Sequence, residues 1–170
     1  FMTGSFSEDT EITGPIASKL FISSETEDTD LFLIARLFNE QQQEVTFQGA
    51  LDPKTPLAQG WLRASHRRID NHLSKPYRPY HTHDKVELLI PKKVYEVDVE
   101  IWPTSIVVPK GYRIGLTIKG QDYVNQSGGG STLPNMNKFS GCGPFLHDDP
   151  IDRPNDCLLY TSDAADEGLG

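Results

Sequence analysis

The sequence predicts an all-β protein built as an antiparallel sandwich, and three observations support this prediction. Short apolar runs alternate with turn residues, and no segment keeps a helical apolar stripe for long. Fourteen glycines and twelve prolines interrupt the chain, which favours many short strands over helices. Two runs alternate between apolar and polar residues, as expected for strands with one buried face. About seven strands at this spacing indicate antiparallel sheets that pack face to face.

The first half of the chain supplies four candidate strands. An apolar run at residues 15–24 is the first of them. Residues 31–38 are apolar at nearly every position, which suits a strand covered on both faces. Periodicity alone does not separate such a run from a short buried helix, but its shortness and the flanking turn residues favour a strand. The other two candidates are residues 44–47, which return from a polar hairpin, and residues 61–67.

The second half begins with an extended crossing loop at residues 73–83 and then contains the clearest strand signal. Residues 94–102 alternate strictly, so that their apolar and acidic side chains take opposite faces. The apolar face holds Tyr95, Val97, Val99 and Ile101, and the acidic face holds Glu96, Asp98 and Glu100. After Pro103, residues 106–108 form a short candidate strand, and residues 112–119 alternate again. Beyond Tyr123 the chain is rich in Gly, Pro and Asp, and we expect order only where it lies over the sandwich.

Composition excludes several classes of partner. The 170 residues include 24 acidic and 16 basic side chains, for a net charge of −8, so nucleic acid is not an expected partner. No apolar run approaches the roughly 18 residues of a membrane span, so no membrane partner is expected either. The only cysteines, Cys142 and Cys157, form neither a ligand cluster nor a disulfide framework, which leaves the compartment open. The start at Phe1, immediately before Met2, suggests a fragment of a longer protein.

The common catalytic signatures are missing from the sequence. It has no G-x-S-x-G elbow, no H-E-x-x-H motif, no P-loop and no G-x-G-x-x-G loop. We therefore expect no catalytic residue, no resident metal and no bound cofactor in this chain. Adjacent side chains of an extended segment point to opposite sides, so residues 147–149 (His-Asp-Asp) are expected to form a turn rather than a catalytic group.

Two segments have residue types that could bind a metal ion. His81 and His83 would share a face on a strand, and Asp84 could add a carboxylate. No third distant ligand is evident, so a polar loop with surface histidines is the preferred interpretation. The acidic residues 25–30 could bind calcium, but they lack the glycine-punctuated loop pattern and are expected to be a solvated loop.

The predicted strand at residues 61–67 has a face that could contact another protein domain. On a strand, Trp61, Arg63 and Arg67 would point the same way, and arginine makes bidentate contacts with carboxylates. The face is therefore a possible domain interface. The alternative is pairing within the chain, for instance with the acidic face of residues 96–100. Both interpretations stay open, because the two kinds of pairing look alike in sequence.

Five segments together resemble the C-terminal domain of the X-Pro dipeptidyl-peptidase and cocaine-esterase (CocE/NonD) serine hydrolases. The resemblance extends over residues 8–156 and depends on the order and spacing of the segments rather than on any one of them. They are residues 11–15 (EITGP), 30–32 (DLF), 60–67 (GWLRASHR), 107–115 (VVPKGYRIG) and 145–154 (FLHDDPIDRP).

The resemblance implies a jelly-roll β-sandwich of the galactose-binding-domain-like type. In that family the sandwich follows an α/β-hydrolase domain, whose Ser-His-Asp triad hydrolyses esters, amides or X-Pro peptides. The triad lies upstream of the matching segment, so no catalytic position can be carried onto this chain. The implied role is a non-catalytic domain that packs on the hydrolase domain and helps to shape its substrate cleft. Whether such a parent enzyme forms homo-oligomers stays open.

The sequence departs from the family at its end. Residues 157–167 (CLLYTSDAADE) stand where a glycine-rich stretch and a closing strand are expected, and they look like one reading frame of a sequencing adapter. We expect residues 1–156 to be the domain, incomplete at both ends, and residues 157–170 to be an adapter artefact. A short genuine strand at residues 158–160 is the alternative. An unclosed sandwich would expose a strand edge and be marginally stable.

Two other functions are compatible with a small β-sandwich. The first is a carbohydrate-binding module, which would need a flat aromatic platform with polar groups beside it. The candidates are Trp61, Trp102, Tyr77 and Tyr80, although tryptophans in strands are more often buried. The second is a metal-dependent enzyme that would use the histidine pair described above.

Overall fold

The computed structural model describes residues 1–49 and 54–123, and within these ranges it contains six strands and one short 3₁₀ helix. The strands are β1 (Thr10–Ile22), β2 (Asp30–Phe38), β3 (Glu44–Val45), β4 (Ala58–Arg63), β5 (Tyr95–Val108) and β6 (Arg113–Lys119), and the 3₁₀ helix η1 is Ala64–His66. All strand pairs are antiparallel. The prediction of an all-β sandwich is confirmed, and the predictions for residues 124–170 concern positions outside the described residues.

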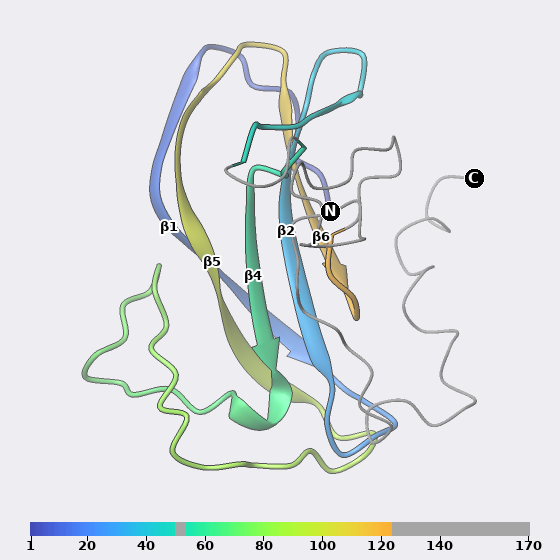
Figure 1. Cartoon of the computed structure of the whole chain (residues 1–170), viewed down its shortest axis with the longest axis vertical. Coiled ribbons are helices and arrows are strands. Elements are labelled where there is room, and N and C mark those ends of the chain that lie inside the picture. The colour runs from blue at the N-terminus through green and yellow to red at the C-terminus, as the bar shows by residue number, and fades with distance from the viewer. Residues whose placement is uncertain (50–53, 124–170) are drawn as a thin grey trace, which may run out of the picture.

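The first layer is a long two-stranded ribbon of β1 and β5 (Figure 1). Its register runs from Thr10 opposite Val108 to Ile22 opposite Tyr95. The register shifts once, between Gly14 and Ile16, where Trp102 and Pro103 of β5 stand opposite the single residue Pro15 of β1. Proline has no N–H to donate, and a bulge removes the need for one. This explains why β5 continues through Pro103, where the sequence predicted a break.

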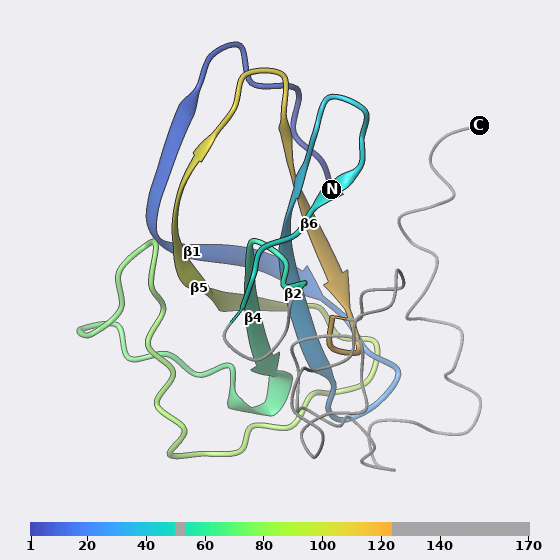
Figure 2. The same cartoon turned by 45° about the horizontal axis from the view of Figure 1, so that its top comes forward.

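The second layer has β2 at its centre. β6 pairs along one edge of β2, and β4 and β3 follow one another along the other edge. β3 must lie on the edge opposite β6, because Leu37 and Phe38 pair with both strands. Residues 1–6 run beside β6, where Thr3 and Phe6 donate backbone hydrogen bonds to Ile114 and Tyr112. Figures 1 and 2 show the β1–β5 ribbon curving across β4 and β2, which gives the two layers of the sandwich.

Alternate residues of the facing strands fill the core between the layers. The core cluster consists of Leu31, Leu33, Ala35, Ala58, Leu62, Val97, Val99 and Ile101. The predicted alternation of β5 is confirmed, because Val97, Val99 and Ile101 are each at most 1% exposed. β2 is also buried on its opposite face, where Phe32 and Ile34 lie, as its continuous apolar run predicted. The hydrophobic pattern therefore determines which face of each strand is buried.

The two layers approach each other closely at Gly60 of β4. A Cβ atom at this position would lie 2.1 Å from the carbonyl oxygen of Glu100 on β5. No side chain fits there, so glycine allows the edge strands of the two layers to meet. On the outside of this meeting point the rings of Trp61 and Trp102 lie edge to face, with centroids 5.0 Å apart.

Several predicted strand boundaries were wrong. β1 begins at Thr10 rather than at residue 15, and the return strand is reduced to β3. The largest error is the run at residues 61–67, where β4 ends at Arg63 and η1 follows. The turn forms because the backbone N–H groups of Ala64 and Ser65 donate to Thr29 and Asp28, which lie far away in sequence. Hydrogen bonds to such distant residues cannot be predicted from the local pattern of apolar and polar residues.

Candidate interdomain interface

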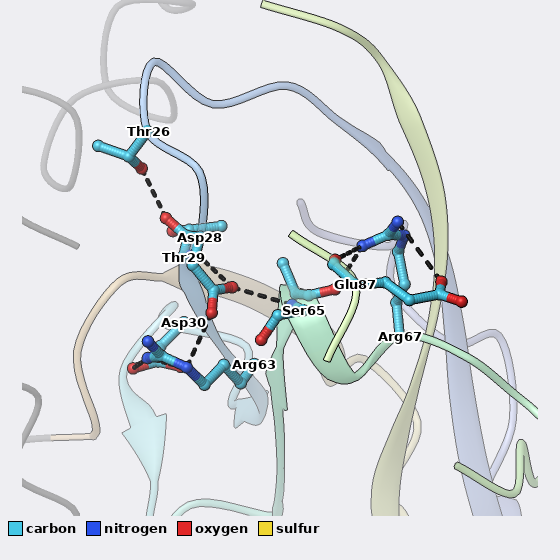
Figure 3. A network of polar contacts seen from close by, with 9 residues as sticks. Thr26, Asp28, Thr29, Asp30, Arg63, Ser65, Arg67 and Glu87 are labelled. Atoms are coloured by element: carbon cyan, nitrogen blue, oxygen red, sulfur yellow. Dashed lines mark hydrogen bonds and ion pairs between the residues drawn. The ribbon is translucent and has the colours of Figure 1, made fainter. Parts of the chain in front are cut away.

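Arg63 lies at the end of β4 in a partly buried ion-pair network (Figure 3). Its Nε atom is 2.9 Å from Oδ2 of Asp28, and its Nη1 atom is 3.2 Å from Oδ2 of Asp30. Asp28 is only 2% exposed. Its Oδ1 atom also accepts backbone hydrogen bonds from Thr29 and Ser65, each at 2.9 Å. A buried carboxylate satisfied in this way fastens the loop before β2 to the turn after β4.

Arg67 follows η1 and holds a different segment. Its guanidinium donates to the backbone oxygens of Ala64 and Glu87, and it lies 3.6 Å from the carboxylate of Glu87. The same group stacks over the ring of Tyr95, 4.6 Å from the centroid. Figure 3 shows Arg67 and Glu87 on the side of η1 opposite Arg63. Arg67 therefore ties the extended segment around Glu87 to the sandwich.

The structure does not bring the three predicted interface residues onto one strand face. Trp61 and Arg63 lie on β4, whereas Arg67 lies beyond η1, because the chain turns after Arg63. The two arginines pair with acids of the loops before β2 and β5 rather than with the acidic face of β5. On that face, Glu96 and Asp98 pair with Lys19 of β1.

The aromatic candidates do not form a flat platform. Trp102 is 62% exposed, so its expected burial was wrong. It follows the acidic residues of β5 on the outward face, which explains the exposure. The planes of Trp61 and Trp102 are inclined by 67°, so the two rings do not form the flat surface expected of a carbohydrate-binding module. Tyr77 and Tyr80 are exposed on the loop between η1 and β5.

The histidine candidates have other partners. Nε2 of His81 lies 2.9 Å from the carbonyl oxygen of Asp98, and desolvation by burial lowers the pKa of His81. The carboxylate of Asp84 accepts a hydrogen bond from Thr82 and lies 3.5 Å from Arg68. Within residues 1–49 and 54–123, no three His, Cys, Asp or Glu side chains are placed to hold a metal ion. In the acidic stretch, Asp28 is buried and paired, so the expectation of a solvated loop was wrong there.

An apolar surface feature was missed by the sequence analysis. Val86, Leu88 and Ile90 are 64%, 52% and 60% exposed, whereas Leu89 between them is 3% exposed. The signal was present as alternate apolar residues at 86, 88 and 90. It could not be interpreted, because Leu89 makes the run look like any buried strand. We call these three exposed side chains the 86–90 ridge.

Comparison with known proteins identifies the family. Residues 1–144 match the model of the X-Pro dipeptidyl-peptidase C-terminal non-catalytic domain. The chain belongs to this family. In a crystal structure of a CocE/NonD family hydrolase from Staphylococcus aureus, the matching part superposes with a TM-score of 0.73 at 29% identity. The match covers 80% of this chain and 24% of the S. aureus chain.

Further relatives agree with this assignment. Two proteins named "Putative serine esterase", one from Mycobacterium bovis and one from Mycobacterium tuberculosis, are each 30% identical to this chain over 120 residues. That match covers 66% of this chain and 17% of each relative. An aminopeptidase from a marine sediment thaumarchaeon shares the fold, with a TM-score of 0.51 at 18% identity. The chain thus spans about a sixth to a quarter of the hydrolases that it matches.

None of the described helices is long and apolar enough to span a membrane.

Proposed function

We propose that this sandwich serves a CocE/NonD-type serine hydrolase by packing on the α/β-hydrolase domain of the same polypeptide, where it stabilises that domain and shapes its substrate cleft. The observation that carries the proposal is the family match over residues 1–144, combined with the small share of each relative that the chain covers. A non-catalytic domain that forms a quarter or less of a hydrolase has its catalytic partner elsewhere in the same chain.

The polar groups of the described residues support a structural role. The buried carboxylate of Asp28 pairs with Arg63 and accepts hydrogen bonds from two backbone N–H groups. The guanidinium of Arg67 pairs with Glu87 and stacks on Tyr95. Neither pair is arranged as a nucleophile beside a general base. In the proposed enzyme, acyl transfer to serine takes place on the partner domain, and this chain supplies a rigid wall.

Trp61, Arg63 and Arg67 contribute to the proposed interface in different ways. Trp61 is half-buried and packs against the exposed Trp102, so this aromatic pair can meet another domain directly. Arg63 and Arg67 act through the loops that they hold, because their guanidinium groups already have partners within the chain. We assign them as positioning residues of the interface.

The proposal predicts that the chain has no hydrolytic activity of its own. The purified chain should release p-nitrophenol from p-nitrophenyl butyrate at the spontaneous rate, with and without EDTA. The complete hydrolase polypeptide should turn the same ester over and lose activity with a serine-directed phosphonate. Saturable ester hydrolysis by the chain alone would overturn the proposal, and its loss on chelation would favour the metal-dependent alternative.

A further inference from the structure

The 86–90 ridge is held outward by the backbone on its inner side. The N–H of Glu87 donates to the carbonyl oxygen of Ser65 at 2.8 Å, and the N–H of Leu89 donates to that of Glu27 at 2.6 Å. These bonds fix residues 87 and 89 against the sandwich, and Leu89 is buried. Side chains alternate along an extended chain, so Val86, Leu88 and Ile90 all point away from the core.

The two positioning arginines stiffen this segment. Arg67 donates to the backbone oxygen of Glu87, and Ser65, which accepts from Glu87, is itself held by the buried carboxylate of Asp28. Arg63 completes that carboxylate's contacts. The ridge is therefore an exposed apolar edge built on a buried polar network, rather than a loose loop.

Other exposed apolar side chains extend the ridge. Lys93 donates its N–H to the carbonyl oxygen of Ile90, and this turn brings Val94, which is 62% exposed, next to the ridge. Phe21, 69% exposed, pairs with Glu96 on the outward face of the ribbon, and Glu96 is two residues beyond Val94 in the chain. Charged groups border this surface, including the ion pair of Lys92 with Glu25. An apolar centre with a charged border is the usual anatomy of a protein interface.

We propose that the 86–90 ridge is the surface on which the α/β-hydrolase domain of the same polypeptide docks. This inference rests on the proposed function and adds where on the sandwich the contact lies. The occupant follows from chain length, because the matching segment makes up only 17% to 24% of the hydrolases it resembles. Among the described residues, the ridge and its two neighbours hold five of the twelve large hydrophobic side chains that are exposed.

Cysteine labelling of the complete hydrolase polypeptide tests the ridge directly. Leu88→Cys probes it, and Leu73→Cys is the matched control, since the two leucines are 52% and 51% exposed and both lie outside strands. Maleimide labelling above the wild-type background is measured in the isolated chain and in the complete polypeptide. The two sites should react alike in the isolated chain. In the complete polypeptide, Leu88→Cys should react about tenfold more slowly, with Leu73→Cys unchanged.

The outcomes separate this inference from the proposed function. Equal labelling of Leu88→Cys in the isolated chain and in the complete polypeptide overturns the ridge as the docking surface. The proposed function still stands in that case if the complete polypeptide hydrolyses the ester and the chain alone does not. Labelling that slows with concentration in the isolated chain shows that a second copy covers the ridge, which also overturns the inference.

Discussion

Gly60→Ala is expected to destabilise the sandwich by about 3 kcal/mol or more, and to leave part of the chain unfolded without denaturant. The added methyl group would lie 2.1 Å from the carbonyl oxygen of Glu100 and 3.0 Å from the Cα atom of Ile101. Both are backbone atoms of β5, so relief requires the two layers to separate. Separation would also loosen the core cluster to which Leu62 of β4 and Val99 of β5 belong.

Urea unfolding followed by tryptophan fluorescence measures this effect, because Trp61 and Trp102 lie at the same meeting point of the layers. Gly4→Ala is the matched control: a Cβ at Gly4 would have no atom within 4 Å, and no positive φ is present there. The control should keep the wild-type midpoint. An unchanged midpoint for Gly60→Ala would show that the layers do not meet at β4 and β5.

Asp28→Ala is expected to cost about 2–4 kcal/mol, because it leaves buried N–H donors without an acceptor and removes one partner of a partly buried ion pair. The change deprives Arg63 of its Nε partner and leaves the N–H groups of Thr29 and Ser65 without their acceptor. Unfolding in urea gives the size of the loss. Asp28→Asn should lose less, because an amide oxygen can still accept from the two N–H groups.

A surface carboxylate provides the control for Asp28. Asp84 lies exposed on a loop, 3.5 Å from Arg68, and Asp84→Ala should leave the urea midpoint unchanged. If Asp28→Ala were as stable as Asp84→Ala, the network in Figure 3 would not fasten the loop before β2, and the rigid support of the ridge would be wrong.

The layers of the sandwich could be predicted because burial imposes a period on the sequence. The alternation at residues 95–101 and the continuous apolar run of β2 depend only on which faces are covered, and both predictions hold. The continuation of β5 through Pro103 could not be predicted. It depends on a register shift against β1, whose residues lie nearly ninety positions away in the chain.

The candidate interface was harder to predict for a related reason. The turn after Arg63 depends on the carboxylate of Asp28, and Arg67 is directed by Glu87, so neither arginine's position follows from its neighbours in sequence. The exposure of Leu88 could not be read either, since Leu88 and the buried Leu89 are the same residue type. Local patterns report burial of whole elements, whereas a surface site depends on long-range contacts.

The central proposal is that this domain stabilises a catalytic partner. The direct measurement is the half-life of ester hydrolysis on heating, for the complete hydrolase polypeptide and for a version that lacks this sandwich domain. The account predicts a half-life about tenfold shorter without the domain, because an apolar docking surface is then left bare on the catalytic domain. Equal half-lives, with full activity in both proteins, would contradict it.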